Sequence, residues 1–346
     1  MACDDLGSPM YGELLRLIAD DFEVGGQSTP LLSGREGEDG WTSALALRLL
    51  GAVHRLVLSG AVPELAAFYP SVGGEWDPVF GWDAFQQVME SHREEIRVWL
   101  EQPPQTNEVG RASALMGGLL RLRELRGEAV RLPVRLFEIG ASAGLNLRAD
   151  RFAYGDQSGL FAGPPDSPVR LAGAWQGMPL TPWPDLVVAE RAGSDIAPLD
   201  PLSTDDALTL TAYVWPDMDA RLARLRGALQ VAAEVPATVH RQDAVSFLRG
   251  LELAVGFTTV LWHSVMWQYL TPDDQAAASG VIVALGNQAT DAAPFAHLYL
   301  EPGHRSQEAL GYDEAPEFLV VLRWWPDGER RVLGAAAPHG IPVTWE

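Results

Sequence analysis

The feature that most constrains the fold is a change of hydrophobic periodicity near residue 130. After it, short runs rich in β-branched residues alternate with helical segments, a pattern typical of a doubly wound parallel sheet. A polar turn within WWPDGERR (324–331) joins the last two runs, which predicts an antiparallel hairpin. The predicted fold is therefore α/β, with a Rossmann-like, mostly parallel sheet of seven strands. The predicted strands are VRLFEIG (134–140), DLVVAER (185–191), ATVHRQD (237–243), TTVLWHS (258–264), FAHLYLEP (295–302), FLVVLRWW (318–325) and RRVLGAAAP (330–338).

Before residue 130 the apolar residues recur at intervals of three and four, which predicts helices. The clearest segments are residues 11–22, 41–60, 82–102 and 107–127. We therefore expect a helical N-terminal region over residues 1–130 and an α/β domain over residues 131–346. A Gly/Pro-rich insertion at about residues 153–184 separates the first two predicted strands and is unsuited to a long helix.

A loop of small residues follows the first predicted strand, and its pattern fits two kinds of site. Residues 140–144 spell G-x-S-x-G, the turn that presents the nucleophilic serine of α/β-hydrolases. With Glu138 the pattern becomes E-x-G-x-S-x-G, close to the E/D-x-G-x-G-x-G loop that holds S-adenosylmethionine. Under that interpretation Ser142 stands where the loop usually has its middle glycine.

The position of the loop in the chain favours the second interpretation. The hydrolase turn follows the fifth strand of its sheet, whereas here only helical segments come before it. A dinucleotide-binding loop would need glycine at the position of Leu145. Small residues followed by a helix with free N–H groups suit S-adenosylmethionine. The candidate cofactor residues in this loop are Glu138, Gly140, Ala141, Ser142 and Gly144.

Two later strand ends carry further candidate cofactor residues. Glu190 is expected to end the second strand, where a carboxylate can accept hydrogen bonds from both ribose hydroxyls. The insertion lengthens the usual spacing between this carboxylate and the loop. Asp243 ends the third strand and could accept from an adenine amino group, with the Ala244 N–H beside it. Asp243 could equally be the N-cap of the next helix.

The acceptor side is expected at the end of the fourth strand, because reactive groups in open α/β sheets gather at the carboxyl ends of strands. His263 is the first candidate for a general base, with a buried core histidine as the alternative. Glu301 and Tyr269 are the other candidate catalytic groups, and Trp262 and Trp267 could line the site.

Composition narrows the possible partners and location. The chain has 46 acidic and 25 basic residues and a formal net charge of -21 at pH 7, which would repel a nucleic acid. Cys3 is the single cysteine, so an internal disulfide and a thiolate metal cluster are excluded, and the histidine spacings predict no metal site. The N-terminus lacks a signal-peptide pattern, and the longest apolar stretch suits a buried strand, so we expect a cytoplasmic protein without a membrane partner.

Several phrases together resemble an uncharacterised bacterial domain-of-unknown-function family that is usually described as methyltransferase-like. They are TNEVGR (106–111), EIGASAGLNLRADRF (138–152), ERAGSDIAPLD (190–200), VWPDMDARLARL (214–225) and WHSVMWQYL (262–270), of which EIGASAGLNL is the most distinctive. The resemblance implies the class I methyltransferase sheet, with S-adenosylmethionine as cofactor.

We therefore expect methyl transfer from S-adenosylmethionine to a small-molecule acceptor. Two alternatives stay open. One is a ligand-binding or regulatory protein that keeps the fold without catalysis. The other is a serine hydrolase in which Ser142, Glu301 and His339 form the triad. The acceptor and the oligomeric state do not follow from the sequence.

Overall fold

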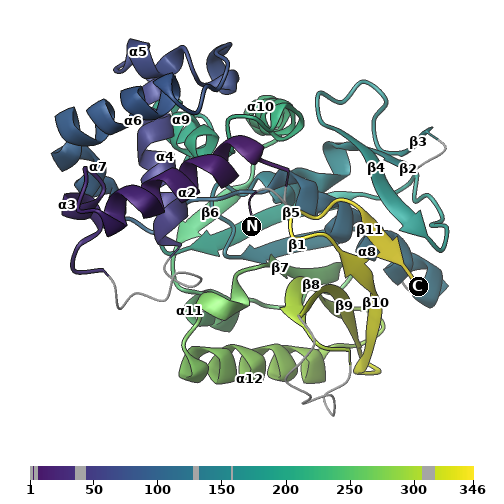
Figure 1. Cartoon of the computed structure of the whole chain (residues 1–346). Coiled ribbons are helices and arrows are strands. Elements are labelled where there is room, and N and C mark those ends of the chain that lie inside the picture. Colours follow the sequence, from purple (N-terminus) through teal and green to yellow (C-terminus); the bar gives the residue numbers. More distant parts are fainter. Residues whose placement is uncertain (1–2, 4–6, 36–43, 128–131, 157–158, 306–315) are drawn as a thin grey trace. The chain divides into compact units, whose positions relative to one another are not determined.

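The computed structural model describes residue 3 and residues 7–35, 44–127, 132–156, 159–305 and 316–346 (Figure 1). The chain forms two units. The first comprises Met1–Thr106 with Ser203–Ala223, and the second comprises Asn107–Leu202 with Arg224–Glu346. The chain therefore leaves the second unit after Leu202 and returns to it at Arg224.

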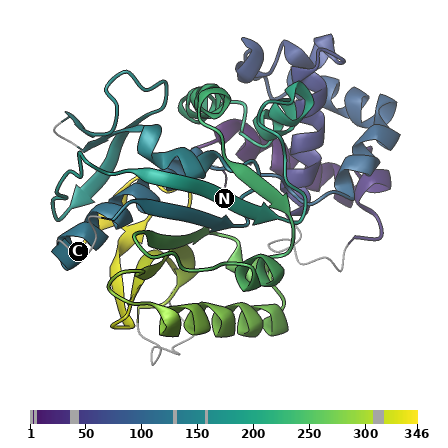
Figure 2. The ribbon, with the colours of Figure 1, turned by 180° about the vertical axis from the view of Figure 1, so that it is seen from behind.

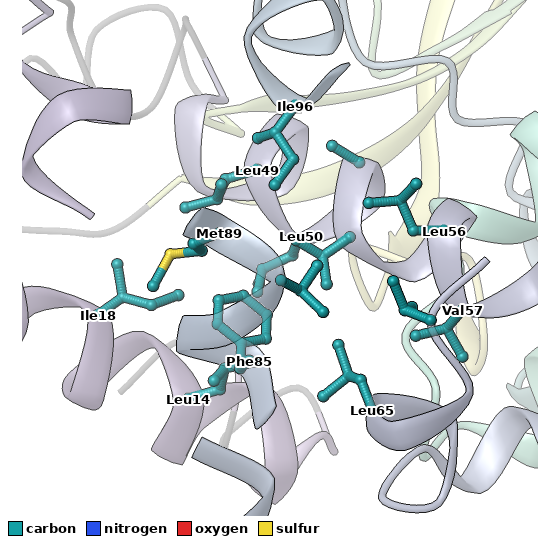
Figure 3. Close-up of a cluster of buried hydrophobic side chains, with 14 of the residues drawn as sticks. Leu14, Ile18, Leu49, Leu50, Leu56, Val57, Leu65, Phe85, Met89 and Ile96 are labelled. Carbon is teal, nitrogen blue, oxygen red and sulfur yellow. The ribbon is translucent and has the colours of Figure 1, made fainter. Parts of the chain in front are cut away.

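The first unit is helical, as the periodicity before residue 130 predicts. Its core joins apolar side chains from several helices, and Figure 3 labels ten of these residues. Phe85, Leu14 and Leu65 are fully buried there, which is where most of the stability of such helices arises. The helices are α2 (Pro9–Glu23), α3 (Thr29–Leu32), α4 (Leu45–Leu58), α5 (Pro63–Ala66), η1 (Pro70–Val72), α6 (Phe80–Ser91), α7 (Arg93–Leu100), α9 (Thr204–Ala212) and the start of α10 (Asp219–Glu234).

Helix α9 completes this unit although it comes about a hundred residues later in the chain. It packs against α4. The buried imidazole of His54 on α4 bonds through Nδ1 to the carbonyl oxygen of Ala212 (3.1 Å) and through Nε2 to Ser71 Oγ (2.8 Å). Burial lowers the pKa of His54 to about 4, so it is neutral at pH 7. A neutral histidine with both nitrogens bonded is a structural group.

Helix α8 (Ala112–Arg126) lies before the predicted domain boundary at residue 130, yet it belongs to the second unit. It packs on strands of the sheet, and its residues Ala112–Leu122 are all buried. Gly117 and Gly118 allow this approach, since a Cβ atom there would lie 2.0 Å from Trp345 and 2.5 Å from Leu298. A helix that is buried on every side has no amphipathic stripe in its sequence, so its sequence does not indicate which part of the protein it packs against.

Among the described residues the strands form one eleven-stranded sheet in the order β3-β2-β4-β11-β10-β9-β8-β7-β1-β5-β6. All seven predicted strands are present. They are β1 (Val134–Ile139), β5 (Val188–Asp195), β6 (Thr238–Arg241), β7 (Thr258–Ser264), β8 (Phe295–Gly303), β9 (Glu317–Trp325) and β10 (Glu329–Ala336). The predicted hairpin is confirmed, because β9 and β10 pair antiparallel, while β6, β5, β1, β7 and β8 are mutually parallel.

Four further strands extend the sheet beyond the seven that were expected. The predicted insertion contributes β2 (Ala153–Asp156), β3 (Gly159–Ala162) and β4 (Arg170–Gly177), and the chain end contributes β11 (Val343–Trp345). Strand β11 pairs with both β10 and β4, so it links the insertion to the rest of the sheet. The insertion is thus sheet rather than helix, as its glycine and proline content indicates.

Helices cover both faces of the sheet. On one face α11 (Ala244–Arg249) and α12 (Pro272–Gln288) lie side by side and share a core with Phe137, Leu261 and Phe295 (Figures 1 and 2). On the other face α8 contacts Leu298. Positions 295 and 298 on β8 are an odd number apart, so their side chains face opposite sides. Other residues on the strands of Phe137 and Leu298 can be assigned to a face in the same way, because side chains an even number of positions apart face the same side.

Within the described residues, no helix combines the length and the apolar character needed to cross a membrane.

Candidate functional site

The strand order places a topological switch point between β1 and β7. From β1 the chain adds β5 and β6 on one side, and β7 and β8 lie on the other. Ligands of open α/β sheets bind in the crevice outside the carboxyl ends of the strands at such a point. The loops that leave β1 at Gly140 and β7 at Val265 meet there, because a Cβ atom on Gly140 would lie 2.8 Å from the Cβ atom of Met266.

The loop after β1 is left-handed at three alternate positions. The φ angles are 68° at Gly140, 51° at Ser142 and 65° at Gly144. Glycine adopts this conformation freely, whereas serine does so at a cost. Ser142 thus has a φ close to those of the glycines two residues before and after it.

Hydrogen bonds that the loop donates to the neighbouring strand β5 hold it in place. Ala141 N–H donates to the carbonyl oxygen of Ser194 (3.0 Å), and Ser142 N–H donates to Asp195 Oδ2 (2.9 Å). Ala141, Ser142 and Gly144 are buried, while Gly140 is exposed. Gly140 is therefore the part of the loop backbone that a ligand can approach.

The segment that follows the loop differs from the expected helix. It is a seven-residue 3-10 helix, η4 (Leu145–Arg151), with non-helical angles at Arg148. Its first N–H, on Leu145, donates to Asn107 Oδ1 (2.9 Å), and the Asn146 amide donates to the carbonyl oxygen of Glu108 (3.3 Å). The side chain of Asn107, in the TNEVGR segment, thus accepts from an N–H group that was expected to be free to bind a ligand.

Strand β5 ends at Asp195, four residues beyond the predicted end at Arg191, and this corrects the placement of Glu190. Glu190 lies in the first half of β5, exposed, where its carboxylate pairs with Arg135 Nε (2.6 Å). The strand ends at Asp195, beside the glycine loop. Asp195 therefore takes the position that was expected for Glu190. The small residues between them concealed the strand, because they lack β-branched side chains.

Asp243 is the N-cap of α11, and Ala244 is the first residue of that helix. The Ser246 N–H donates to Asp243 Oδ1 (2.8 Å). This hydrogen bond from the Ser246 backbone lowers the pKa of Asp243. The structure thus shows the capping role of Asp243, and its contact with a ligand stays a prediction.

Glu138 is a buried carboxyl group directly before the loop. Burial raises its pKa to about 8, an effect that the nearby Trp262 indole partly offsets. Asp195 raises the pKa further, whereas Arg148 and Arg111 lower it. Within the described residues, neither Glu138 Oε2 nor Trp262 Nε1 has a hydrogen-bond partner. Buried polar atoms are rarely left so, and an absent ligand or water is the usual explanation.

His263 is buried in a chain of hydrogen bonds that extends along β8. Its Nδ1 lies 2.8 Å from Glu301 Oε1, and its Nε2 lies 2.9 Å from Nε2 of His297. Its ring also stacks with those of Trp267 and Tyr299. Burial and, to a smaller extent, the proximity of His263 lower the pKa of His297 well below its usual range, so His297 is neutral. With both ring nitrogens engaged, His263 does not offer a free nitrogen to a substrate in this conformation.

The other candidate acceptor-side groups lie close to His263. Glu301 is buried on β8, with Oε2 unpaired among the described residues, and Tyr269 is about half exposed (54%) on η5 (Trp267–Tyr269). His297 was missed by the sequence analysis, although its even spacing from Glu301 on one strand places both on the same face. Met266 was missed too, and no pattern in the sequence marks it.

Two members of the formal hydrolase triad contact residues outside it. Glu301 bonds to His263, whereas Nδ1 of His339 lies 3.8 Å from Glu108. Ser142 is buried, with 4% of its surface exposed. In the described part of the chain, no group of three or more His, Cys, Asp or Glu residues is arranged to hold a metal ion.

Comparison with known proteins identifies the family. Residues 1–345 match the model of a family described as "Uncharacterized protein conserved in bacteria (DUF2332)". The match covers almost the whole chain, so the chain belongs to this family. No curated protein matches it.

Proposed function

We propose that this member of the bacterial DUF2332 family binds S-adenosylmethionine at the switch point and transfers its methyl group to a small molecule. The observation that carries the proposal is the left-handed backbone at Gly140, Ser142 and Gly144, in the loop after the first strand of a doubly wound sheet. This conformation at alternate positions is what an E-x-G-x-G-x-G loop requires, and Ser142 adopts it without being glycine.

The residues around the loop offer the backbone exposure and the hydrogen-bond acceptors that the cofactor needs. Gly140 is exposed at the carboxyl edge of the sheet, where a ligand can approach its backbone. Glu138 Oε2 can accept from an ammonium group, and Asp195 ends the strand next to β1 with lone pairs suited to ribose hydroxyls. When bound, the cofactor supplies an electrophilic methyl group on a sulfonium.

On the acceptor side, Tyr269 is the better candidate for contact with the acceptor, because both ring nitrogens of His263 bond to other residues of the protein. A group that takes a proton from the acceptor must reach it directly or through one water. The side chain of Tyr269 is exposed on the loop after β7, whereas both nitrogens of His263 bond to protein. We therefore rank Tyr269 above His263 as a group that contacts the acceptor.

A second function, ligand binding without transfer, is favoured by the same observation on His263. The two functions separate in an assay with S-adenosylmethionine carrying a labelled methyl group and a panel of small nucleophiles. Transfer that falls in Tyr269→Phe, at unchanged cofactor affinity, supports the enzyme. Cofactor binding with no transfer to any nucleophile supports the binding protein.

Cofactor binding is tested by calorimetric titration with S-adenosylhomocysteine. Gly140→Val places a branched side chain against Met266 and beside the proposed ligand, so it should abolish binding. Gly173→Val is the matched control, because Gly173 has a similar φ of 63° with no atom within 4 Å of an added Cβ. It should bind like the wild type. No binding by the wild type at millimolar ligand, or equal binding by both variants, would contradict the proposal.

A further inference from the structure

One carboxylate oxygen fixes the loop that leaves β7. Glu301 Oε1 lies 2.8 Å from His263 Nδ1, and it accepts from the N–H groups of Met266 (3.0 Å) and Trp267 (3.3 Å). A carboxylate only accepts hydrogen bonds, so His263 Nδ1 carries the proton in the first contact. Hydrogen bonds to an ionised carboxylate are roughly twice as strong as neutral ones. The two loop N–H groups therefore tie the loop firmly to β8, and His263 Nδ1 on β7 is the third donor to the same oxygen.

The same loop contains a strained backbone. Val265 has a φ of 51°, a conformation in which a β-branched residue is an outlier. Its N–H donates to the carbonyl oxygen of Leu300 on β8 (2.9 Å), directly before Glu301. Such strain persists only where surrounding contacts over-determine it, and it gathers at functional sites.

The consequence of this conformation is the position of Met266. A Cβ atom on Gly140 would lie 2.8 Å from Cβ and 2.9 Å from Cγ of Met266, so the Met266 side chain lies directly on Gly140. Gly140 is also the exposed position of the glycine loop. Met266 thus forms one wall of the space beside the backbone that a ligand can approach.

His263 keeps Glu301 in place. Its ring stacks with Trp267, at 5.1 Å between centroids, and with Tyr299, at 5.2 Å, and its Nε2 bonds to His297. With the imidazole fixed on three sides, the Nδ1–H points at Glu301 Oε1. This arrangement gives His263 a role that does not require contact with substrate.

We propose that Met266 determines which ligands fit beside Gly140, and that Glu301, oriented by His263, is the positioning residue that holds Met266 there. The inference rests on the proposed function for the class of ligand, a sulfonium nucleoside. It predicts that Met266 limits the size of the alkyl group that the ligand carries at this position.

The first test compares the affinities of S-adenosylmethionine and its S-ethyl analogue by calorimetry. The wild type should prefer the methyl compound by about tenfold or more, the usual worth of one methylene in a fitted pocket. Met266→Ala should remove most of this preference by opening space beside Gly140. An unchanged preference in Met266→Ala would overturn the role of Met266, whereas absence of binding by the wild type would overturn the proposed function.

The second test needs no ligand. Amide hydrogen exchange at Met266 and Trp267 should be several-fold faster in Glu301→Leu, which removes the acceptor, and closer to the wild type in Glu301→Gln, which keeps an oxygen. Asp21→Asn is the control. Asp21 is a carboxylate of equal exposure (8%) that accepts the Ser28 N–H (2.7 Å) in the helical unit. Equal exchange at Met266 and Trp267 in Glu301→Leu and the wild type would overturn the positioning role.

Discussion

Glu138 makes a prediction about the dependence of stability on pH. Its pKa is raised to about 8 in the folded chain, from the usual value of 4.5, so the folded state holds a proton that the unfolded state has released between these values. Stability should therefore fall as the pH rises from about 4.5 to about 8, by up to about 1.4 kcal/mol per pH unit. Below this window the carboxyl is protonated in both states, and above it the loss is complete.

Glu138→Gln should remove this contribution, since an amide does not titrate. The free energy of unfolding, measured by denaturant titration at several pH values, should favour the variant increasingly as the pH rises through the window. A constant difference between variant and wild type from pH 5 to pH 8.5 would show that the carboxyl does not titrate near 8.

Ser142 separates the methyltransferase proposal from the hydrolase alternative. A nucleophile replaced by alanine loses nearly all covalent chemistry, whereas a loop residue so replaced should leave ligand binding nearly unchanged. Because Ser142 is buried and takes a glycine-like conformation, we expect Ser142→Ala to bind S-adenosylhomocysteine like the wild type. We also expect fluorophosphonate to leave the wild type unlabelled, and mass spectrometry showing stoichiometric labelling of Ser142 would reverse this conclusion.

The sequence predicted the individual site residues unevenly. The small-residue loop was located because glycine spacing reflects backbone conformation, which is local. Asp195 was passed over for Glu190, because Ala192, Gly193 and Ser194 hide a strand that its parallel neighbours stabilise. The partners of His263 come from β8 and the following loop, and contacts between distant segments leave no spacing to detect.

Alanine substitutions at two helical glycines should change the free energy of unfolding in opposite directions. In a free helix, alanine is more stable than glycine by up to about 1 kcal/mol. Gly280 on α12 has open space around an added Cβ, so Gly280→Ala should stabilise the chain by this amount. At Gly117 on α8 the Cβ would lie 2.0 Å from the Trp345 ring, so Gly117→Ala should destabilise by about 1–3 kcal/mol. Thermal unfolding of both variants measures the difference, and stabilisation by both would refute the packing of α8 on β11.

The N-cap of α11 gives a test of whether Asp243 also binds ligand. Losing a cap costs about 0.5–2 kcal/mol. Asp243→Ala should therefore lose this much stability, as should Thr271→Ala, which removes the cap of α12. If Asp243 only caps, both variants should keep the affinity of the wild type for S-adenosylhomocysteine. A loss of affinity confined to Asp243→Ala would assign it to the ligand site.

Regular elements were easier to predict than short or buried ones. The seven predicted strands carry β-branched runs, and their alternation with helices indicated the parallel sheet. Strands β2, β3, β4 and β11 have three to eight residues each, and they form because an existing sheet offers hydrogen bonds. The segment after Gly144 was expected to be a helix, but it is the 3-10 helix η4, with non-helical angles at Arg148 and its first N–H bonded to Asn107.

The division of the whole chain could not be predicted from periodicity alone. Helices before residue 130 all look alike in sequence, yet α8 joins the sheet while residues 203–223 join the helical unit. The reasons are contacts of long range: Gly117 and Gly118 fit under Trp345 and Leu298, and His54 bonds to Ala212. Such complementarity exists only once both partners are folded.

The most direct measurement of the central claim is a crystal structure of the protein with S-adenosylhomocysteine. We predict that the ligand lies at the carboxyl ends of β1 and β7, with its chain against Gly140 and Met266 and with Glu138 and Asp195 within hydrogen-bond distance. Ligand density at another place, or none in crystals grown at saturating ligand, would contradict the assignment of the cofactor site to the loop at Gly140–Gly144.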